Sequence, residues 1–225
     1  MLFGGLGSNV FNPAMAARAF LTATFGVAMT TWTVPATTDS AMPILSAASP
    51  AAITQATPLA WSKMAQKKEA KAQEANSMTV NAFWGNRGGC LGETSAAALI
   101  IGGVYLLIRK TISWHIPASV LLSAGAVSLA AWLLRPEQYA SPLLHLFGGG
   151  MMIGAFFIAT DPVTAPLTVK GRWLFGIGVG GLIMLIRLVG EYPEGVMYAV
   201  LIMNALSPLI DRFCKRIPAG GLPNV

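Results

Sequence analysis

The sequence predicts an all-α integral membrane protein with about six transmembrane helices. Apolar residues make up 54% of its 225 residues, and charged residues only 11%, whereas soluble domains carry about 25% charged residues. The mean hydropathy is +0.61. The apolar stretches are also close to the roughly 20 residues that a helix needs to cross a bilayer. These observations exclude a soluble globular domain.

The expected spans divide the chain into three regions. The spans cover approximately residues 15–34, 93–108, 116–134, 143–160, 173–189 and 196–211. The first region, residues 1–34, holds a glycine-rich start, an Asn-Pro-Ala motif and one membrane helix. A long polar loop follows over residues 35–92. Residues 93–225 then form a five-helix membrane domain.

The distribution of charge predicts the orientation of the chain. The formal net charge is +6, but the basic residues lie in short loops and not along one soluble face, which argues against a nucleic-acid partner. Lys and Arg concentrate in cytoplasmic loops. Alternation of the spans collects on one side Arg109, Lys110, Lys170, Arg172, Arg212, Lys215 and Arg216. We therefore expect a multi-pass protein of the bacterial inner (cytoplasmic) membrane with an extracytoplasmic loop 35–92 and a cytoplasmic C-terminus.

Two similar signals, one in each half of the chain, suggest a repeated architecture. Asn12 before Pro13 predicts an N-cap with proline at the first helical position. In the second half, the glycines of 148–150 lead to Asp161-Pro162. Paired Gly/Pro-interrupted segments indicate an inverted-repeat bundle with broken helices. The alternative is that Asn12 and Asp161 only cap helices.

The long loop contains the clearest candidate site. Residues 35–58 are rich in Ala, Ser, Thr and Pro, whereas residues 61–75 are strong helix formers of mixed charge and predict a solvated surface helix. Between them, Thr57 closes a Thr-Gln-Ala-Thr stretch with small neighbours. Its accessible hydroxyl is the kind of atom to which a phosphoester-linked flavin is attached. An ordinary Thr-Pro turn is the alternative.

Ionisable residues in or near the spans are functional candidates, because such groups are costly in lipid. They are Glu93, Asp161, Arg187 and His145. Each also has a structural interpretation: Glu93 can cap the following helix, Arg187 can extend to the membrane surface, and His145 can simply be hydrogen-bonded. We therefore assign none of them as catalytic.

The two cysteines indicate no metal or disulfide site. Cys90 and Cys214 lie at opposite membrane edges on this topology, so they cannot pair and are expected to be free thiols. The sequence contains no cluster with metal-ligand spacing and no glycine loop for nucleotide phosphates. Two cysteines cannot complete a four-thiolate iron–sulfur site within this chain, although either could join ligands from another subunit. No metal site is assigned.

Several motifs together resemble the RnfD family, a membrane component of the Rnf ion-translocating electron-transport complex. They are Phe3-Gly-Gly-Leu-Gly, Phe11-Asn-Pro-Ala-Met, the stretch from Thr54 to Ala60, Gly89-Cys-Leu-Gly-Glu-Thr-Ser, Ala159-Thr-Asp-Pro-Val-Thr and the segment from Tyr192 to Asp211. The match spans nearly the whole chain. A more distant resemblance is to NqrB of the sodium-pumping NADH:quinone reductase.

The resemblance implies a membrane subunit of a multi-subunit enzyme, inactive alone, that moves electrons between ferredoxin and NAD and couples this to sodium or proton transport. It implies FMN attached through its phosphate to Thr57 by a separate flavin transferase, although Ala51 and Gln55 replace the aspartate and glycine of the family motif. NAD is expected to bind another subunit. The family fold is two inverted five-helix repeats, so six spans suggest a version truncated at the N-terminus.

Two other functions remain open on the sequence alone. Asn12-Pro13-Ala14 and the few membrane charges suggest a channel or transporter for small neutral solutes. The changes at Ala51 and Gln55 suggest a structural subunit without flavin. Bound flavin distinguishes both alternatives from the redox function.

Overall fold

The computed structural model describes residues 9–30, 57–67, 76, 78–85, 89–90, 92–190 and 194–214, except for the side chain of Val27. These residues form helices and connecting turns without any strand. The α-helices are α1 (Pro13–Thr24), α2 (Gly26–Thr30), α3 (Pro58–Gln66), α5 (Thr79–Trp84), α6 (Ala96–Ile108), α7 (His115–Leu134), α8 (Pro142–Phe147), α9 (Met151–Ile153), α10 (Val169–Val189) and α11 (Val196–Phe213). A π-helical segment, η1 (Gly154–Ile158), continues α9.

Three of the described helices, α7, α10 and α11, are long and apolar enough to cross a membrane. Their lengths are 20, 21 and 18 residues, and at 1.5 Å per residue each approaches the roughly 30 Å of a hydrocarbon core. Helix α6 has only 13 residues. The expectation of an all-α membrane architecture is thus supported, whereas six complete spans remain a prediction.

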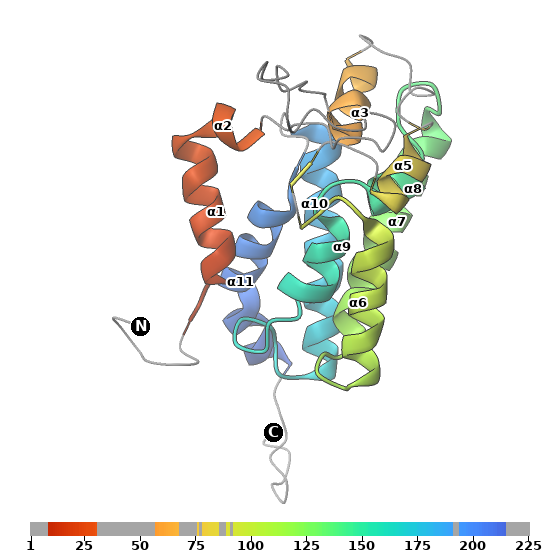
Figure 1. Cartoon of the computed structure of the whole chain (residues 1–225). Helices are drawn as coiled ribbons and strands as arrows, with labels where there is room; N and C mark the ends of the chain where they lie inside the picture. The colour runs from red at the N-terminus through yellow and green to blue at the C-terminus, as the bar shows by residue number, and fades with distance from the viewer. Residues whose placement is uncertain are drawn as a thin grey trace, which may run out of the picture.

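The centre of the bundle is α10, which packs against α7 and α11 (Figure 1). Glycines allow the close approach to α7. A Cβ atom on Gly176 would overlap the Ser119 hydroxyl, and one on Gly180, a turn later, would overlap the Ser123 hydroxyl. Small residues four apart are the usual means by which membrane helices pack closely. The polar serines are accommodated because their hydroxyls donate to carbonyls of their own helix.

Two of the expected spans are interrupted. The prediction of one helix over residues 143–160 is wrong: α8 ends at Phe147, and a turn over 148–150 precedes α9. Gly149 adopts φ +61° there, a conformation that favours glycine. The expected helix over residues 15–34 ends at Thr24, and α2 follows after Phe25. Both α1 and the α9–η1 segment therefore extend through only part of the bundle (Figure 1).

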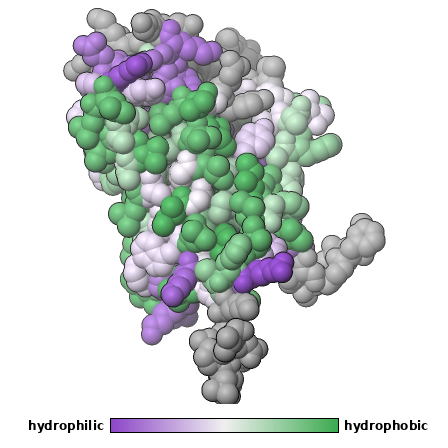
Figure 2. Space-filling view, turned by 180° about the vertical axis from the view of Figure 1, so that it is seen from behind, coloured by the Kyte–Doolittle hydropathy of each residue, from purple (hydrophilic) through white to green (hydrophobic). Residues whose placement is uncertain are grey.

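The outer surface of the bundle is apolar around its middle. Figure 2 shows apolar side chains over the central part of one face, with hydrophilic side chains gathered toward the two ends. Large exposed apolar side chains include Ile101, Ile108, Leu122, Leu134 and Val189. A continuous apolar surface of this kind is rare on soluble monomers. The lipid bilayer is the natural environment for such a band.

Candidate functional site

Thr57 is the N-cap of α3. Its Oγ1 accepts a hydrogen bond from the backbone N–H of Ala60 at 3.2 Å, and Pro58 occupies the first helical position. The sequence therefore starts the helix locally, through a capping hydroxyl and a proline whose fixed φ suits the first turn. Thr57 is half-buried. The neighbouring positions Ala51, Thr54 and Gln55 lie outside the described residues.

Helix α3 packs on the bundle and is not simply solvated. It begins before the expected start of the 61–75 helix, at Pro58, and buries Leu59, Ser62 and Ala65. Leu59 lies against the 148–150 turn: a Cβ atom on Gly148 would come within 3.3 Å of its side chain. Lys63 Nζ donates to the carbonyl of Gly190 at 2.6 Å. These contacts fix the helix that begins at Thr57.

Several buried polar atoms on α3 and α8 have no hydrogen-bond partner among the described residues. They are Trp61 Nε1, Ser62 Oγ, Gln66 Nε2 and both ring nitrogens of His145. Buried polar groups in proteins are normally paired, so this group of atoms marks a place where the bundle has unused hydrogen-bonding capacity. The expectation that His145 is simply hydrogen-bonded is not met by its ring nitrogens. Its backbone carbonyl, in contrast, accepts a hydrogen bond from Arg187.

Arg187 is fully buried beneath this region, with 1% exposure. Its guanidinium donates from Nη1 to the carbonyl of His145 at 2.5 Å and from Nη2 to the carbonyl of Gly148 at 3.1 Å. Nη2 also lies 3.4 Å from Glu194 Oε1. The suggestion that Arg187 extends to the membrane surface is therefore wrong. The side chain points inward because it binds three acceptors there. Two are the carbonyls of His145 and Gly148, which the end of α8 leaves without helical donors, and the third is the carboxylate of Glu194.

A second ion pair, between Arg18 of α1 and Glu93, lies beside the first. Gly150 separates the two pairs. Its N–H donates to both oxygens of Glu194 at 3.1 and 3.3 Å, and a Cβ atom on Gly150 would lie 3.2 Å from Glu93 Oε1 and 3.4 Å from Glu194 Oε1. Arg18, Glu93, Glu194 and Arg187 thus form one partly buried charge network around a glycine.

The network revises the expected role of Glu93. The N-cap of α6 is Ser95, whose hydroxyl accepts from the N–H of Ala98 at 3.2 Å. Glu93 therefore does not cap the helix by a hydrogen bond; its carboxylate pairs with Arg18 two residues before the cap. Glu194 and the pairing of Arg18 were not identified from the sequence. The pairing of Arg187 with Glu194 could have been predicted from the sequence. An arginine buried in a membrane protein needs a nearby carboxylate, and Glu194 lies only seven residues after Arg187.

The two Asx-Pro motifs contact each other. Asn12 caps α1 as expected, accepting from the N–H groups of Ala14 and Met15. Its Nδ2 also donates to Asp161 Oδ2 at 3.4 Å, across 149 residues of sequence. Asp161 further accepts from the Val163 N–H and from the Thr164 hydroxyl, so it organises a turn and does not cap a regular helix. The contact joins the ends of the two broken segments, α1 and α9–η1.

The cysteines and acidic residues provide no metal centre in the described ranges. Cys90 and Cys214 are free thiols, as expected. Within the same ranges, the side chains of His, Cys, Asp and Glu form no group of three or more suited to a metal ion.

Long apolar helices, two interrupted membrane segments and buried ion pairs define a polytopic helical membrane protein. Residues 1–220 match the model of the NQR2, RnfD, RnfE family, and the chain belongs to this family. The resemblance inferred from the motifs is thereby confirmed.

Curated relatives are named as subunits of ion-translocating oxidoreductase complexes. The chain is 42% identical over 223 residues to a subunit of the "Proton-translocating ferredoxin:NAD(+) oxidoreductase complex" of Clostridium ljungdahlii, covering 96% of this chain and 63% of the relative. It is 44% identical over 217 residues to the sodium-translocating counterpart of Acetobacterium woodii, covering 95% and 60%. For a subunit of the "Ion-translocating oxidoreductase complex" of Stutzerimonas stutzeri the identity is 41% over 227 residues, with 95% and 64% covered. The chain thus spans about three fifths of these relatives' length.

Proposed function

We propose that this chain is a membrane subunit of an ion-translocating oxidoreductase complex, carries FMN as a phosphoester on Thr57, and passes electrons between ferredoxin- and NAD-linked partners. The names of the relatives support the redox role, and they include both a proton- and a sodium-translocating complex. The observation that carries the site assignment is the position of Thr57 at the N-terminus of a helix that is packed onto the buried charge network.

The residues present fit a phosphoester at this position. The backbone N–H of Leu59 lies in the first turn of α3, where helix N–H groups and the helix dipole favour a phosphate, whereas that of Ala60 is donated to Thr57 Oγ1. On the same helix, Trp61 Nε1 and Ser62 Oγ are buried without a hydrogen-bond partner among the described residues. The flavin, when attached, supplies one- and two-electron chemistry; the protein holds its phosphate and sets its surroundings.

The charge network has a positioning role in this proposal. Arg187 and Glu194 bind the carbonyls and the N–H of the 148–150 turn. Leu59 of α3 packs on that turn. The network therefore fixes the surface on which the Thr57-bearing helix sits, without contacting the reacting atoms itself.

The proposed setting is the bacterial cytoplasmic membrane, with the α3 end extracytoplasmic. The turn after α6, the turn before α10 and the end of α11 lie together at the end of the bundle opposite α3 (Figure 1). These segments and the first turn of α10 contain the basic residues Arg109, Lys110, Arg172 and Arg212, and such residues favour the cytoplasmic side. Partners are the other membrane subunits of the complex and a flavin transferase.

The test is in-gel ultraviolet fluorescence of the denatured chain after co-expression with its flavin transferase. Thr57→Ala and Thr57→Asn are compared with the parent. Asn retains the N-cap but offers no hydroxyl, so it separates attachment from folding. The proposal expects a fluorescent parent and two dark variants with normal membrane levels. A dark parent, with the transferase active on a known substrate, would favour the structural subunit without flavin; a fluorescent Thr57→Asn chain would place the flavin elsewhere.

A further inference from the structure

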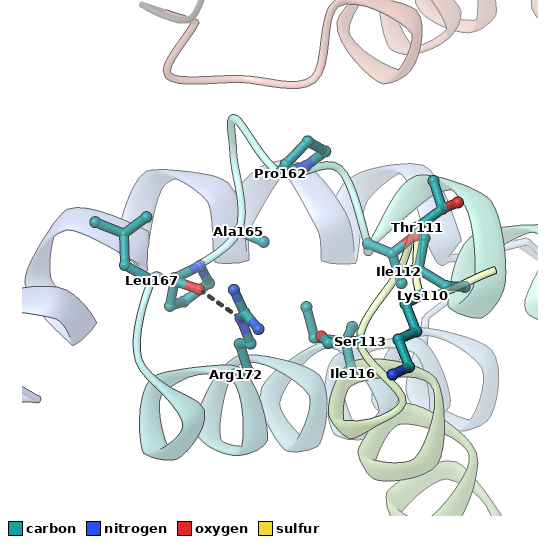
Figure 3. A pocket seen from close by; sticks show the side chains of 11 residues that line it. Lys110, Thr111, Ile112, Ser113, Ile116, Pro162, Ala165, Leu167 and Arg172 are labelled. Carbon is teal, nitrogen blue, oxygen red and sulfur yellow. Dashed lines mark hydrogen bonds between the residues drawn. The ribbon is translucent and has the colours of Figure 1, made fainter. Parts of the chain in front are cut away.

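A pocket of about 270 Å³ (Figure 3) lies beside the turn after α6 and the start of α10, at the end of the bundle that lies opposite α3 in Figure 1. It lies between the turn after α6, the 160–167 segment and the first turns of α7 and α10. Its lining combines two basic residues, Lys110 and Arg172, with the hydroxyl residues Thr111, Ser113 and Thr160. No role in electron transfer or flavin attachment involves this pocket, so any function it has is independent of the proposed one.

The two basic side chains enter the pocket from different elements, and in the view of Figure 3 they lie on either side of Ser113 and Ile116. Arg172 is oriented by a hydrogen bond from its Nε to the carbonyl of Pro166 at 3.2 Å. This bond leaves the two terminal nitrogens, the fork that binds phosphate best, available. Lys110 is held in a left-handed turn at φ 55°, a conformation that few non-glycine residues adopt.

Neither cation has a carboxylate partner among the described residues, where the ion pairs are Arg18 with Glu93 and Arg187 with Glu194. The acidic residues nearby are engaged. Asp161 accepts hydrogen bonds from Asn12, Val163 and Thr164, and Asp211 accepts from the N–H of Leu167 at 3.1 Å. Of the three hydroxyls, that of Thr160 already donates to the carbonyl of Phe156 at 2.7 Å, so Thr111 and Ser113 supply the hydroxyls for a ligand. The pocket is thus positively charged and has two hydroxyl donors, which is the chemistry that recognises a phosphate group.

Exposed apolar residues, here called the apolar rim, accompany the lining in the sequence. Leu167 lines the pocket and is 55% exposed; Ile108, two residues before Lys110, is 74% exposed, and Val169, two residues after Leu167, is 52% exposed. Trp114 stands beside it, 57% exposed, with its ring in edge contact with Trp173. Exposed tryptophans typically mark the level of lipid headgroups. A ligand with a phosphate and apolar chains would therefore place each part against matching surface.

We propose that this pocket binds the phosphate of an anionic phospholipid, with Arg172 and Lys110 as its cationic ligands and the acyl chains along Ile108, Leu167 and Val169. The volume of about 270 Å³ is at the small end for ligand pockets, which suits a headgroup and not a whole lipid. Basic pockets between membrane helices on the cytoplasmic side are known to hold anionic headgroups.

The test is a lipid titration of the full chain in non-ionic detergent, read by native mass spectrometry, with phosphatidylglycerol against phosphatidylcholine. The variants are Arg172→Gln, Lys110→Asn, which tolerates the left-handed turn, and Arg109→Gln as a matched cation that does not line the pocket. We expect the affinity for phosphatidylglycerol to fall about tenfold for each pocket variant, because each loses one charge-assisted hydrogen bond. For Arg109→Gln we expect a fall of less than about threefold. Helix content by circular dichroism verifies folding, and Lys110→Asn carries the test if Arg172→Gln misfolds.

Three outcomes would overturn the proposal. Equal affinity for the two lipids would show that the phosphate charge is not selected. An equal loss in Arg109→Gln would indicate diffuse surface attraction and no defined site. Displacement of the lipid by millimolar inorganic phosphate would show that the pocket takes free phosphate, because a lipid that also uses the apolar rim should resist that competition.

Discussion

Replacing Arg187 by Met should destabilise the bundle by about 3–5 kcal/mol, the usual cost of removing one partner from a buried ion pair. Met keeps much of the volume of arginine but removes all three contacts of the guanidinium. The carbonyls of His145 and Gly148 lose their donor, and each unsatisfied buried group costs about 1–3 kcal/mol. Glu194 would retain the hydrogen bond from the N–H of Gly150 but lose its cation.

The measurement is unfolding of the full chain in mixed micelles, followed by circular dichroism. Arg135→Met is the matched control, since Arg135 is exposed and its side chain makes one hydrogen bond, to Gln138 at 3.3 Å; it should change stability by less than about 0.5 kcal/mol. The double variant Arg187→Met with Glu194→Gln should recover about 1 kcal/mol or more of the loss, because it removes the unpaired charge. A loss below about 1 kcal/mol in Arg187→Met would refute the assignment of a buried, paired arginine.

Three further predictions use the same unfolding measurement. Thr57→Ala should cost about 1 kcal/mol through loss of the α3 cap, and Thr57→Asn almost nothing; equal losses would contradict the cap. Gly180→Ala should cost about 1–3 kcal/mol, because its Cβ meets a serine hydroxyl of α7, whereas Gly181→Ala, with open space around it, should gain up to about 1 kcal/mol. Asn12→Asp should cost about 1 kcal/mol or more by facing Asp161 with a like charge, and adding Asp161→Asn should restore stability; no rescue would show that the pair does not interact.

Local signals in the sequence were sufficient for features that depend on a few neighbouring residues. Asn12-Pro13 predicted the start of α1, because an N-cap hydrogen bond and the proline φ act within one turn. The apolar composition predicted the helical membrane class. Thr57 was recognised as distinctive by its small neighbours, although its capping role was not.

Interactions between distant segments were beyond local signals. Hydropathy over 143–160 is continuous and predicted a single span, although the glycines of 148–150 were recognised as a sign of a broken helix. The break itself depends on Gly149 at positive φ and on carbonyls that Arg187 satisfies from α10. The partners Arg18 and Glu93 are 75 residues apart. No periodicity in the sequence encodes which cation meets which carboxylate; only the packed arrangement of the helices does.

The break at 148–150 also explains why the charges gather where they do. Ending α8 early leaves backbone carbonyls without helical donors inside the bundle, and a buried cation is the strongest donor available for them. That cation then requires a carboxylate, which Glu194 supplies while also binding the Gly150 N–H. A Cβ atom on Gly150 would contact both Glu93 and Glu194 closely, so their carboxylates would have to shift by a few tenths of an ångström. The helix break therefore depends on the glycine turn and the ion pairs together, since each satisfies groups that the others leave unpaired. Helix α3, which Thr57 caps, packs on this turn through Leu59.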